Sequence, residues 1–396
     1  MKRVLLFLKN LIFSALFFVI LLEMLIQGVD LFRFRNLQSS SIALDSFYAA
    51  DENTMDVVCI GSSSVYRFFS APVMYKEQQI TMYNYATAQM PFEAGIDLLD
   101  EISYTQKPKL FVIDVRGFIV RTKNILSKNA ETDAYLEQQE SYINRILNNM
   151  PITPARSSLI HRVVPEYLNQ NELIWQFEYA RTHNNWKDLT KDDVLNYVKK
   201  KLGKEVQEEP LLDKNGEPME ENNYKGAVTV SSVDYVEAVD VSKYTKTATL
   251  SKDRVKILDD YVKKIKEKGY NVLFISTPYP VTEEQYSYEK YFEEYFKNNG
   301  MNYLNCNNFY NEIGIDFSSD FYDEKHVNTL GAYKVTSYLG KYIKEHYKLN
   351  PTLLSKTQQK DWQTSTDLWY KEVYEPGVEK IMTTVNKHKA KGSTNY

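Results

Sequence analysis

Five short apolar runs, spaced along the chain with helical patterns between them, constrain its fold more than any other feature of the sequence. The clearest runs are continuously apolar and do not alternate with polar residues, which is typical of parallel strands buried on both faces of a sheet. Strands and helices that alternate at this spacing predict an open, mostly parallel sheet with helices on both sides. The expected strands are 56–60, 80–83, 109–115, 271–276 and 302–305. The predicted fold class is α/β, a three-layer sandwich around a five-stranded, mostly parallel sheet.

The expected helices carry start and stop signals of their own. Ser251 is a preferred N-cap residue ahead of a helix that Gly269 would end. Thr282, followed by Gln285 three residues later, matches the pattern of a capping box. The predicted helices are 92–103, 251–268, 282–298 and 329–346.

The chain has 396 residues, more than one average domain, and its third and fourth expected strands lie far apart. We expect an α/β domain over 50–348, a large helical insertion in it at about 121–250, and a helical tail at 349–396. The tail helix is expected over 363–374 and should end before Pro376. An insertion of roughly 130 residues is far longer than an ordinary loop. It is therefore either a lid or partner surface beside a site, or a structural addition without a chemical role.

The first thirty residues differ in kind from the rest. Residues 4–26 are apolar apart from four polar positions, and as a helix they would span about 35 Å, enough to cross a hydrocarbon core of ~30 Å. Lys2, Arg3 and Lys9 precede the most apolar part, which predicts a cytoplasmic N-terminus and an extracytoplasmic remainder. The alternative is a cleaved signal peptide. Because no small-x-small cleavage pattern follows the apolar stretch, we favour residues 1–30 as a retained, single-pass anchor in the cell membrane.

Charge, cysteine content and short motifs narrow the function classes. The formal net charge of −4 gives no electrostatic reason to expect a nucleic-acid partner. Cys59 and Cys306 are the only cysteines; buried free thiols are the simplest interpretation, and a disulfide between them stays open. The sequence has no His-x-x-x-His pair, cysteine pair, calcium loop or glycine-rich phosphate loop. We therefore expect neither a metal ion nor a cofactor.

Two segments far apart in the chain carry residues that could do chemistry together. Ser63 follows an expected strand and Gly61, at the carboxyl edge where open parallel sheets place their sites. Asp323 and His326 stand three residues apart just before the last predicted helix, so the carboxylate could orient the imidazole. Together they would form a Ser-His-Asp set, in which the histidine activates the serine hydroxyl. The alternatives are that the serine segment only caps a helix, and that the Asp-x-x-His spacing arises by chance or caps the helix after it.

These segments, together with a third, resemble the SGNH (GDSL-type) hydrolase superfamily. The matching motifs are Gly-Ser-Ser at 61–63, Tyr-Asn-Tyr-Ala at 83–86 and Asp-x-x-His-x-Asn-x-x-Gly-Ala at 323–332. In layout the chain is most similar to the membrane-anchored cell-envelope branch that includes the DltD-like proteins. The resemblance covers about 55–120 and 250–348 and leaves the insertion out. It implies a flavodoxin-like SGNH fold.

The resemblance assigns roles to particular residues. It implies that Ser63 is the catalytic nucleophile, that His326 is its general base and that Asp323 orients the base. The oxyanion hole of the family combines the serine N–H with a glycine N–H after the second strand and an asparagine side chain after the third. In this chain the glycine position falls on Ala86 or Ala88, either of which still offers an N–H.

The chain departs from the family pattern after the third strand, where it has Asp114-Val115-Arg116-Gly117 and no asparagine. Arg116 or Asn84 would then supply the missing donor. The alternative for Arg116 is a pairing with a carboxylate such as Asp114. Asn84, Ala86 and Arg116 are therefore the expected oxyanion or substrate-binding residues.

The expected function is that of a membrane-anchored, extracytoplasmic serine esterase or O-acyltransferase. It would act on an acylated cell-envelope glycan or teichoic acid through an acyl-serine intermediate. The resemblance also implies cooperation with a membrane-bound O-acyltransferase that exports the acyl group. Two alternatives stay open: a catalytically degenerate SGNH-like scaffold that binds glycan or an envelope-assembly partner, and simple lipase activity.

Overall fold

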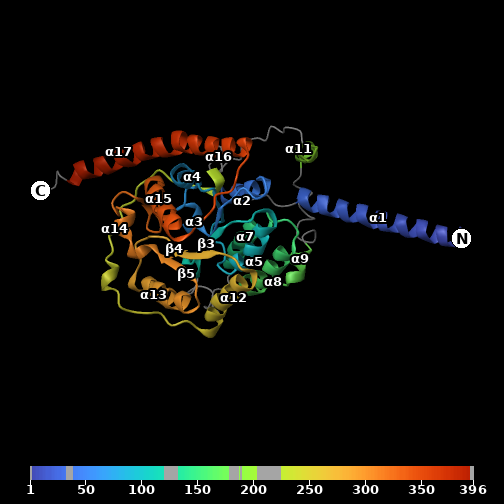
Figure 1. Ribbon diagram of the computed structural model, residues 1–396, viewed down its shortest axis with the longest axis horizontal. Helices are drawn as coiled ribbons and strands as arrows, with labels where there is room; N and C mark the ends of the chain where they lie inside the picture. Colours follow the sequence, from blue (N-terminus) through green and yellow to red (C-terminus); the bar gives the residue numbers. More distant parts are fainter. Residues whose placement is uncertain are drawn as a thin grey trace.

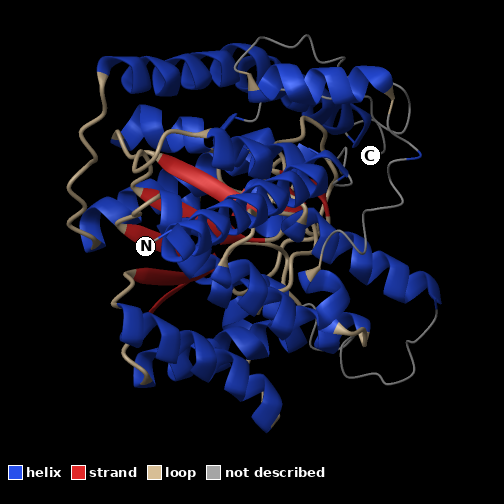
Figure 2. Ribbon diagram, turned by 90° about the vertical axis from the view of Figure 1, so that its right-hand side faces the viewer, coloured by secondary structure: helices blue, strands red, loops and turns tan. Residues whose placement is uncertain are grey.

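A single parallel sheet forms the centre of the protein, whose structure is a computed structural model that describes residues 2–32, 39–119, 133–177, 187, 190–202 and 224–392. The strand order is β2-β1-β3-β4-β5, and all four pairings are parallel. Figure 2 shows the strands enclosed by helices. The predicted α/β class and its five-stranded parallel sheet are confirmed. The strands are β1 (Val57–Gly61), β2 (Met82–Ala86), β3 (Leu110–Asp114), β4 (Val272–Ser276) and β5 (Asn302–Asn305).

Alternate residues of each strand point to opposite faces of the sheet and enter two separate cores. In β1, Val58 and Ile60 join the first core, whereas Val57 and Cys59 join the second. Figure 1 shows helices on both sides of the strands, so the chain has three layers. The first core is covered by α5 (Ala94–Thr105), α12 (Lys252–Lys268) and α13 (Glu283–Asn298), and the second by α4 (Ala71–Gln78) and α15 (Thr329–His346).

The predicted helix signals are confirmed. The Ser251 side chain accepts a hydrogen bond from the backbone N–H of Arg254 at the start of α12, and Gly269 ends that helix in the left-handed conformation. Thr282 and Gln285 form both bonds of a capping box at the start of α13. These caps satisfy backbone groups that a helix end would otherwise leave without partners.

Two strand features differ from the sequence prediction. The second strand was expected at 80–83 but runs over Met82–Ala86. It extends through Asn84, which is fully buried. This polar residue interrupts the apolar run from which the strand was predicted, so the prediction stopped short of the strand's true end. The structure also has a short antiparallel pair, β6 (Phe321–Asp323) and β7 (His326–Val327), which the sequence did not predict. Strands this short carry no periodic pattern.

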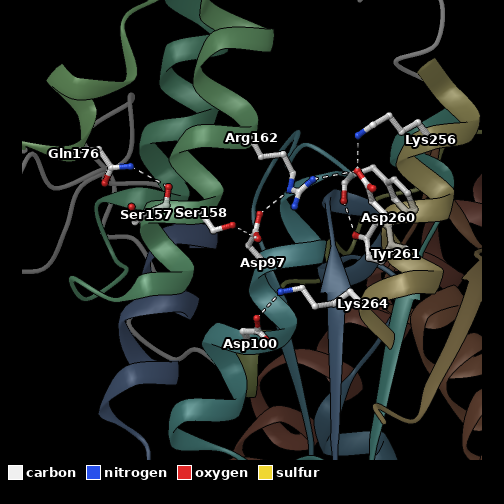
Figure 3. A network of polar contacts seen from close by, with 11 residues as sticks. Asp97, Asp100, Ser157, Ser158, Arg162, Gln176, Lys256, Asp260, Tyr261 and Lys264 are labelled. Atoms are coloured by element: carbon white, nitrogen blue, oxygen red, sulfur yellow. Dashed lines mark hydrogen bonds and ion pairs between the residues drawn. The ribbon is translucent and has the colours of Figure 1, made fainter. Parts of the chain in front are cut away.

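The first part of the predicted insertion is built into the fold. Helices α7 (Asp133–Leu147) and α8 (Pro154–Leu168) add buried side chains to the first core. Figure 3 shows how polar contacts tie α8 to its neighbours: Arg162 lies 2.8 Å from Asp97 of α5 and 3.5 Å from Asp260 of α12. These two helices are a structural addition to the sheet domain.

The rest of the insertion is less regular. It contains α11 (Lys191–Lys201), while residues 224–250 have no strand and only two short 3₁₀ turns. This extended segment is fixed along its course; for example, the backbone N–H of Val228 donates to the carbonyl of Tyr66 at 2.9 Å. Residues 120–132, 178–186, 188–189 and 203–223 of the predicted insertion lie outside the described residues.

The C-terminal tail is helical, but its helices are longer than predicted. Helix α16 (Lys356–Trp369) continues through a π-helical turn into α17 (Glu375–Gly392), with no break at Pro376. The expectation that Pro376 ends the helix was wrong. Proline is tolerated in the first turn of a helix, where its missing N–H is not needed, and Pro376 is the second residue of α17, after the π-helical turn that ends at Tyr374.

The N-terminal helix α1 (Lys2–Phe32) projects away from the body of the protein, as Figure 1 shows. Its segment Leu6–Gly28 is long and apolar enough to cross a membrane and is not buried within the protein. A second helix, α2 (Ser39–Ala49), follows it and packs the buried ring of Phe47 against Tyr85.

Candidate active site

Ser63 stands at the carboxyl end of β1, where the chain turns sharply into the short helix α3 (Ser63–Tyr66). The turn requires glycine at position 61, because a Cβ there would lie 2.5 Å from Cγ2 of Val65 and 3.2 Å from Cβ of Asp114. The hydroxyl of Ser64 donates a hydrogen bond to the buried carboxylate of Asp114 at the end of β3. The neighbouring strand therefore holds the turn, and Ser63 lines the cleft above it.

Asp323 and His326 lie in the hairpin formed by β6 and β7. One carboxylate oxygen of Asp323 accepts hydrogen bonds from the backbone N–H groups of Lys325 and His326, each 2.7 Å long. The two carboxylate oxygens lie 3.0 and 2.9 Å from Nδ1 of His326. The same aspartate therefore shapes the hairpin and fixes the orientation of the imidazole.

The structure brings these two segments together. Oγ of Ser63 lies 2.8 Å from Nε2 of His326, although 263 positions separate the two residues in the chain. Because Nδ1 of the same ring faces Asp323, the three side chains form a hydrogen-bonded series in the order serine, histidine, aspartate. This is the geometry by which a histidine can take the serine proton while a carboxylate holds its ring.

The surroundings of His326 favour its neutral form. Burial lowers the pKa of His326; the hydrogen bond to Asp323 opposes this, and the positive charges of Arg116 and Arg67 lower the pKa further. Burial raises the pKa of Asp323, but hydrogen bonds from His326 and from the hairpin backbone outweigh it, so the pKa is lowered on balance. At neutral pH the imidazole is neutral and the carboxylate charged, the states that a general base and its orienting acid require.

A small cleft of about 70 Å³ opens over Ser63 and His326. A second cavity, of about 260 Å³, shares Arg116 and Lys325 with the cleft. A larger cavity of about 280 Å³, between α2 and α16, contains none of the predicted site residues. The small cleft therefore holds the candidate active site; it is lined by Ser62, Ser63, Ser64, Gln89, Met90, Arg116, Gly117, Lys325 and His326.

Arg116 is the predicted auxiliary residue that the structure places in the cleft. Its side chain is buried, its guanidinium lies 3.7 Å from the ring centre of Tyr279, and one nitrogen donates to the carbonyl of Lys325 at 2.5 Å. Its Nη1 has no hydrogen-bond partner within the described part of the chain. One oxygen of Asp114 accepts from Ser64 and the other has no hydrogen-bond partner there either, so the alternative pairing of Arg116 with Asp114 does not form.

The structure places Asn84 and Ala86 in β2, outside the lining of the cleft. Asn84 is fully buried, and its amide donates to the carbonyls of Phe69, at 2.7 Å, and Gly226, at 3.3 Å. Ala86 pairs with Gly61 in the parallel register. Neither residue lines the reaction cleft.

Gln89 is a cleft residue that sequence reasoning missed. It is exposed, lines the cleft and has a φ of 57°, in the left-handed region that non-glycine residues rarely adopt. Backbone strain of this kind is concentrated at functional sites. Nothing in the residue type signals this conformation, so the local sequence gave no means of finding it.

The described residues contain no group of three or more histidine, cysteine or acidic side chains placed to hold a metal ion. Cys59 and Cys306 are both buried and are not joined in a disulfide. Burial raises the pKa of each thiol, which disfavours the reactive thiolate. These cysteines therefore offer no competing nucleophile.

Comparison with known proteins assigns no function to the candidate site. No protein-family model matches this chain, and no curated protein matches its sequence significantly.

Proposed function

We propose that this protein is a membrane-anchored, extracytoplasmic serine esterase or O-acyltransferase of the SGNH type. Its substrate would be an acylated cell-envelope glycan or teichoic acid. The observation that carries the proposal is the 2.8 Å separation of Ser63 Oγ and His326 Nε2, with Asp323 bonded to the other ring nitrogen. The apolar helix α1 supports the membrane anchorage.

In the proposed reaction, Ser63 Oγ attacks the carbonyl carbon of an acyl ester while Nε2 of His326 takes the serine proton. The tetrahedral intermediate collapses, the ester bond breaks, and the imidazolium gives its proton to the leaving alkoxide. The acyl-serine is then attacked by water or by a glycan hydroxyl, which loses its proton to His326. The second tetrahedral intermediate expels Ser63 Oγ, which takes that proton back from the imidazolium and releases the acid or the acylated glycan. Asp323 keeps the ring in the required tautomer and stabilises the imidazolium.

The oxyanion that forms in both steps needs donors on the cleft side of Ser63. The residues available there are Arg116, whose Nη1 has no other partner in the described structure, and Gln89, which contributes an amide side chain. Asn84 is not available, since its amide already donates to two carbonyls. Arg116 therefore replaces the asparagine of the family pattern in this proposal.

The size of the cleft bears on the acyl group. The cleft measures about 70 Å³, roughly a quarter of the adjoining cavity, so it fits a short acyl group better than a long chain. This favours a small-acyl esterase or transferase over a lipase. The adjoining cavity of about 260 Å³ is large enough for a bulkier alcohol or sugar portion.

The test is labelling of the purified full-length protein with a fluorophosphonate probe, which reacts covalently with activated serines. We expect labelling that Ser63→Ala abolishes and that Ser62→Ala, one residue away in the same turn, retains. Circular dichroism of both variants checks that the fold is intact. A folded wild-type protein that does not label would overturn the proposal and favour the scaffold alternative.

A second measurement separates the proposed reactions. Turnover of short p-nitrophenyl esters in water indicates an esterase. Labelling at Ser63 without such turnover, together with acyl transfer when an oligosaccharide acceptor is added, indicates a transferase. Faster turnover of long-chain than of short-chain esters would support the lipase alternative.

A further inference from the structure

Helix α11 carries an apolar stripe that the described part of the chain leaves exposed. Val194, Leu195, Val198 and Leu202 recur at the spacing of one helix face, and their exposed fractions lie between 39% and 66%. Leu202 follows the last residue of α11 and stays in register, because its backbone N–H donates to the carbonyl of Val198 at 3.1 Å. A continuous apolar face of this kind on a soluble surface marks an interaction site.

The position of α11 identifies what covers the stripe. The hydroxyl of Tyr197 lies 2.6 Å from the side-chain oxygen of Gln27 and 3.2 Å from its backbone carbonyl. Gln27 is in the last turn of the apolar segment Leu6–Gly28. If that segment spans a bilayer, its end lies at the boundary between hydrocarbon and water, and Tyr197 brings α11 to the same depth.

The sequence of α11 matches the chemistry of that boundary. The helix contains four lysines and two aspartates; Lys191 precedes the apolar stripe by one turn, and Lys199 follows Val198 directly. Interfacial helices combine an apolar face that enters the acyl region with lysines that meet anionic headgroups. Tyrosine is itself enriched at this level of a membrane, because its ring is apolar and its hydroxyl polar.

A second group of apolar side chains lies at the same end of the molecule. Leu173 and Ile174 of α9 (Glu172–Gln176) and the adjacent Phe177 are each more than half exposed. Figure 1 shows α9 and α11 at the end of the body from which α1 projects. Two separate exposed apolar groups at the base of one apolar helix are explained together by a lipid surface at that end.

We infer that α11 lies in the plane of the membrane surface, with Val194, Leu195, Val198 and Leu202 inserted among the lipids. This inference rests on the proposed anchorage through α1. It assigns α11 a second attachment, which restricts rotation of the body about the anchor. The catalytic domain is thereby held in one orientation to the membrane and does not swing freely on α1.

The test uses single cysteines labelled with an environment-sensitive fluorophore in the full-length protein, reconstituted in vesicles of phosphatidylcholine and phosphatidylglycerol. The native Cys59 and Cys306 are buried and stay unlabelled. The variants are Val198→Cys on the stripe, Asp192→Cys as the matched control on the polar side of the same helix, and Phe17→Cys in the middle of α1. Emission maxima and quenching by nitroxide-labelled lipids are recorded for each.

We expect emission from position 198 to shift to the blue and to be quenched by lipids that carry the nitroxide near the headgroup, with position 192 unshifted. Strong quenching at 17 without any at 198 would overturn the inference while leaving the anchorage standing. Absence of quenching at 17 would overturn the anchorage itself. Equal quenching at 192 and 198 would also contradict the inference, because it would mean that the stripe is not the inserted face.

Discussion

Replacement of Asp323 by asparagine tests the proposed site with the smallest change in shape. The asparagine oxygen can still accept the two 2.7 Å hydrogen bonds from the hairpin backbone, so the hairpin should keep its form. The amide nitrogen would then take the place of Oδ2, 2.9 Å from Nδ1 of His326, while the oxygen at 3.0 Å is already engaged by the two backbone N–H groups. Since two donors cannot share that contact, the imidazole proton moves to Nε2. That nitrogen is the one that must accept the proton of Ser63.

The expected loss is large in rate and small in stability. A histidine held in the wrong tautomer costs a serine hydrolase about 10⁴-fold in rate, or about 5.4 kcal/mol at 1.36 kcal/mol per tenfold. Only one charge-assisted hydrogen bond is lost from the fold, and the Asp323 side chain is 43% exposed, so the free energy of unfolding should fall by about 1 kcal/mol. The fluorophosphonate labelling rate measures the first quantity, and thermal unfolding measures the second.

Glu324→Gln is the matched control for Asp323→Asn, because it makes the same acid-to-amide change at the exposed neighbouring residue of the hairpin. Its labelling rate should equal that of the wild type. If Asp323→Asn labelled within about tenfold of the wild type, the role of Asp323 in setting the tautomer would be refuted. A large fall in thermal stability with the loss of labelling would instead mean that the variant disrupts the hairpin.

Three further predictions follow from buried charges. The labelling rate should fall as the pH drops through the pKa of His326, which burial lowers below the usual 6.5. Arg116→Met should shift the midpoint of this pH profile upward, because it removes a nearby positive charge, and an unshifted midpoint would contradict this. Asp97→Asn should lower the free energy of unfolding, measured in urea, by about 2 kcal/mol, because the carboxylate of Asp97 is only 1% exposed and pairs with Arg162. Lys256→Met, at a 73% exposed position, should change it by less than about 0.5 kcal/mol, and equal losses would refute the argument. Burial raises the pKa of Glu289 from 4.5 to about 7, so the stability that its protonated form contributes is fully present below pH 4.5 and is lost as the pH rises through about 7. Glu289→Gln should therefore reduce the fall in melting temperature between pH 5 and pH 8. An unchanged fall would contradict this assignment.

Much of the sheet and the site could be predicted because both depend on strong local patterns. Continuous apolar runs identify strands buried on both faces, and parallel strands bring their carboxyl ends to one edge. Ser63 follows such a run directly, so its place at that edge could be deduced from the sequence. Asp323 and His326 have a spacing that a single turn satisfies, and the hairpin supplies that turn.

The parts that could not be predicted depend on contacts between distant segments. Asn84 was a candidate donor because it is polar and follows an expected strand, yet its amide bonds to Phe69 and Gly226, and the latter is 142 positions away. Gln89 lines the cleft because of a backbone conformation that its type disfavours. The path of α17 through Pro376 depends on the π-helical turn before it. None of these features has a periodic or compositional signal.

The end of β3 explains how two segments so far apart are held at hydrogen-bond distance. Asp114 accepts a hydrogen bond from Ser64 and so fixes the turn that carries Ser63. Arg116, two residues later, donates to the carbonyl of Lys325 and so fixes the hairpin that carries His326. One strand end therefore positions both partners, and their 2.8 Å contact does not depend on the serine–histidine hydrogen bond alone. Under the proposed function, the residues at 114–117, where the sequence departs from the pattern it resembles, would set the distance on which the proposed chemistry depends.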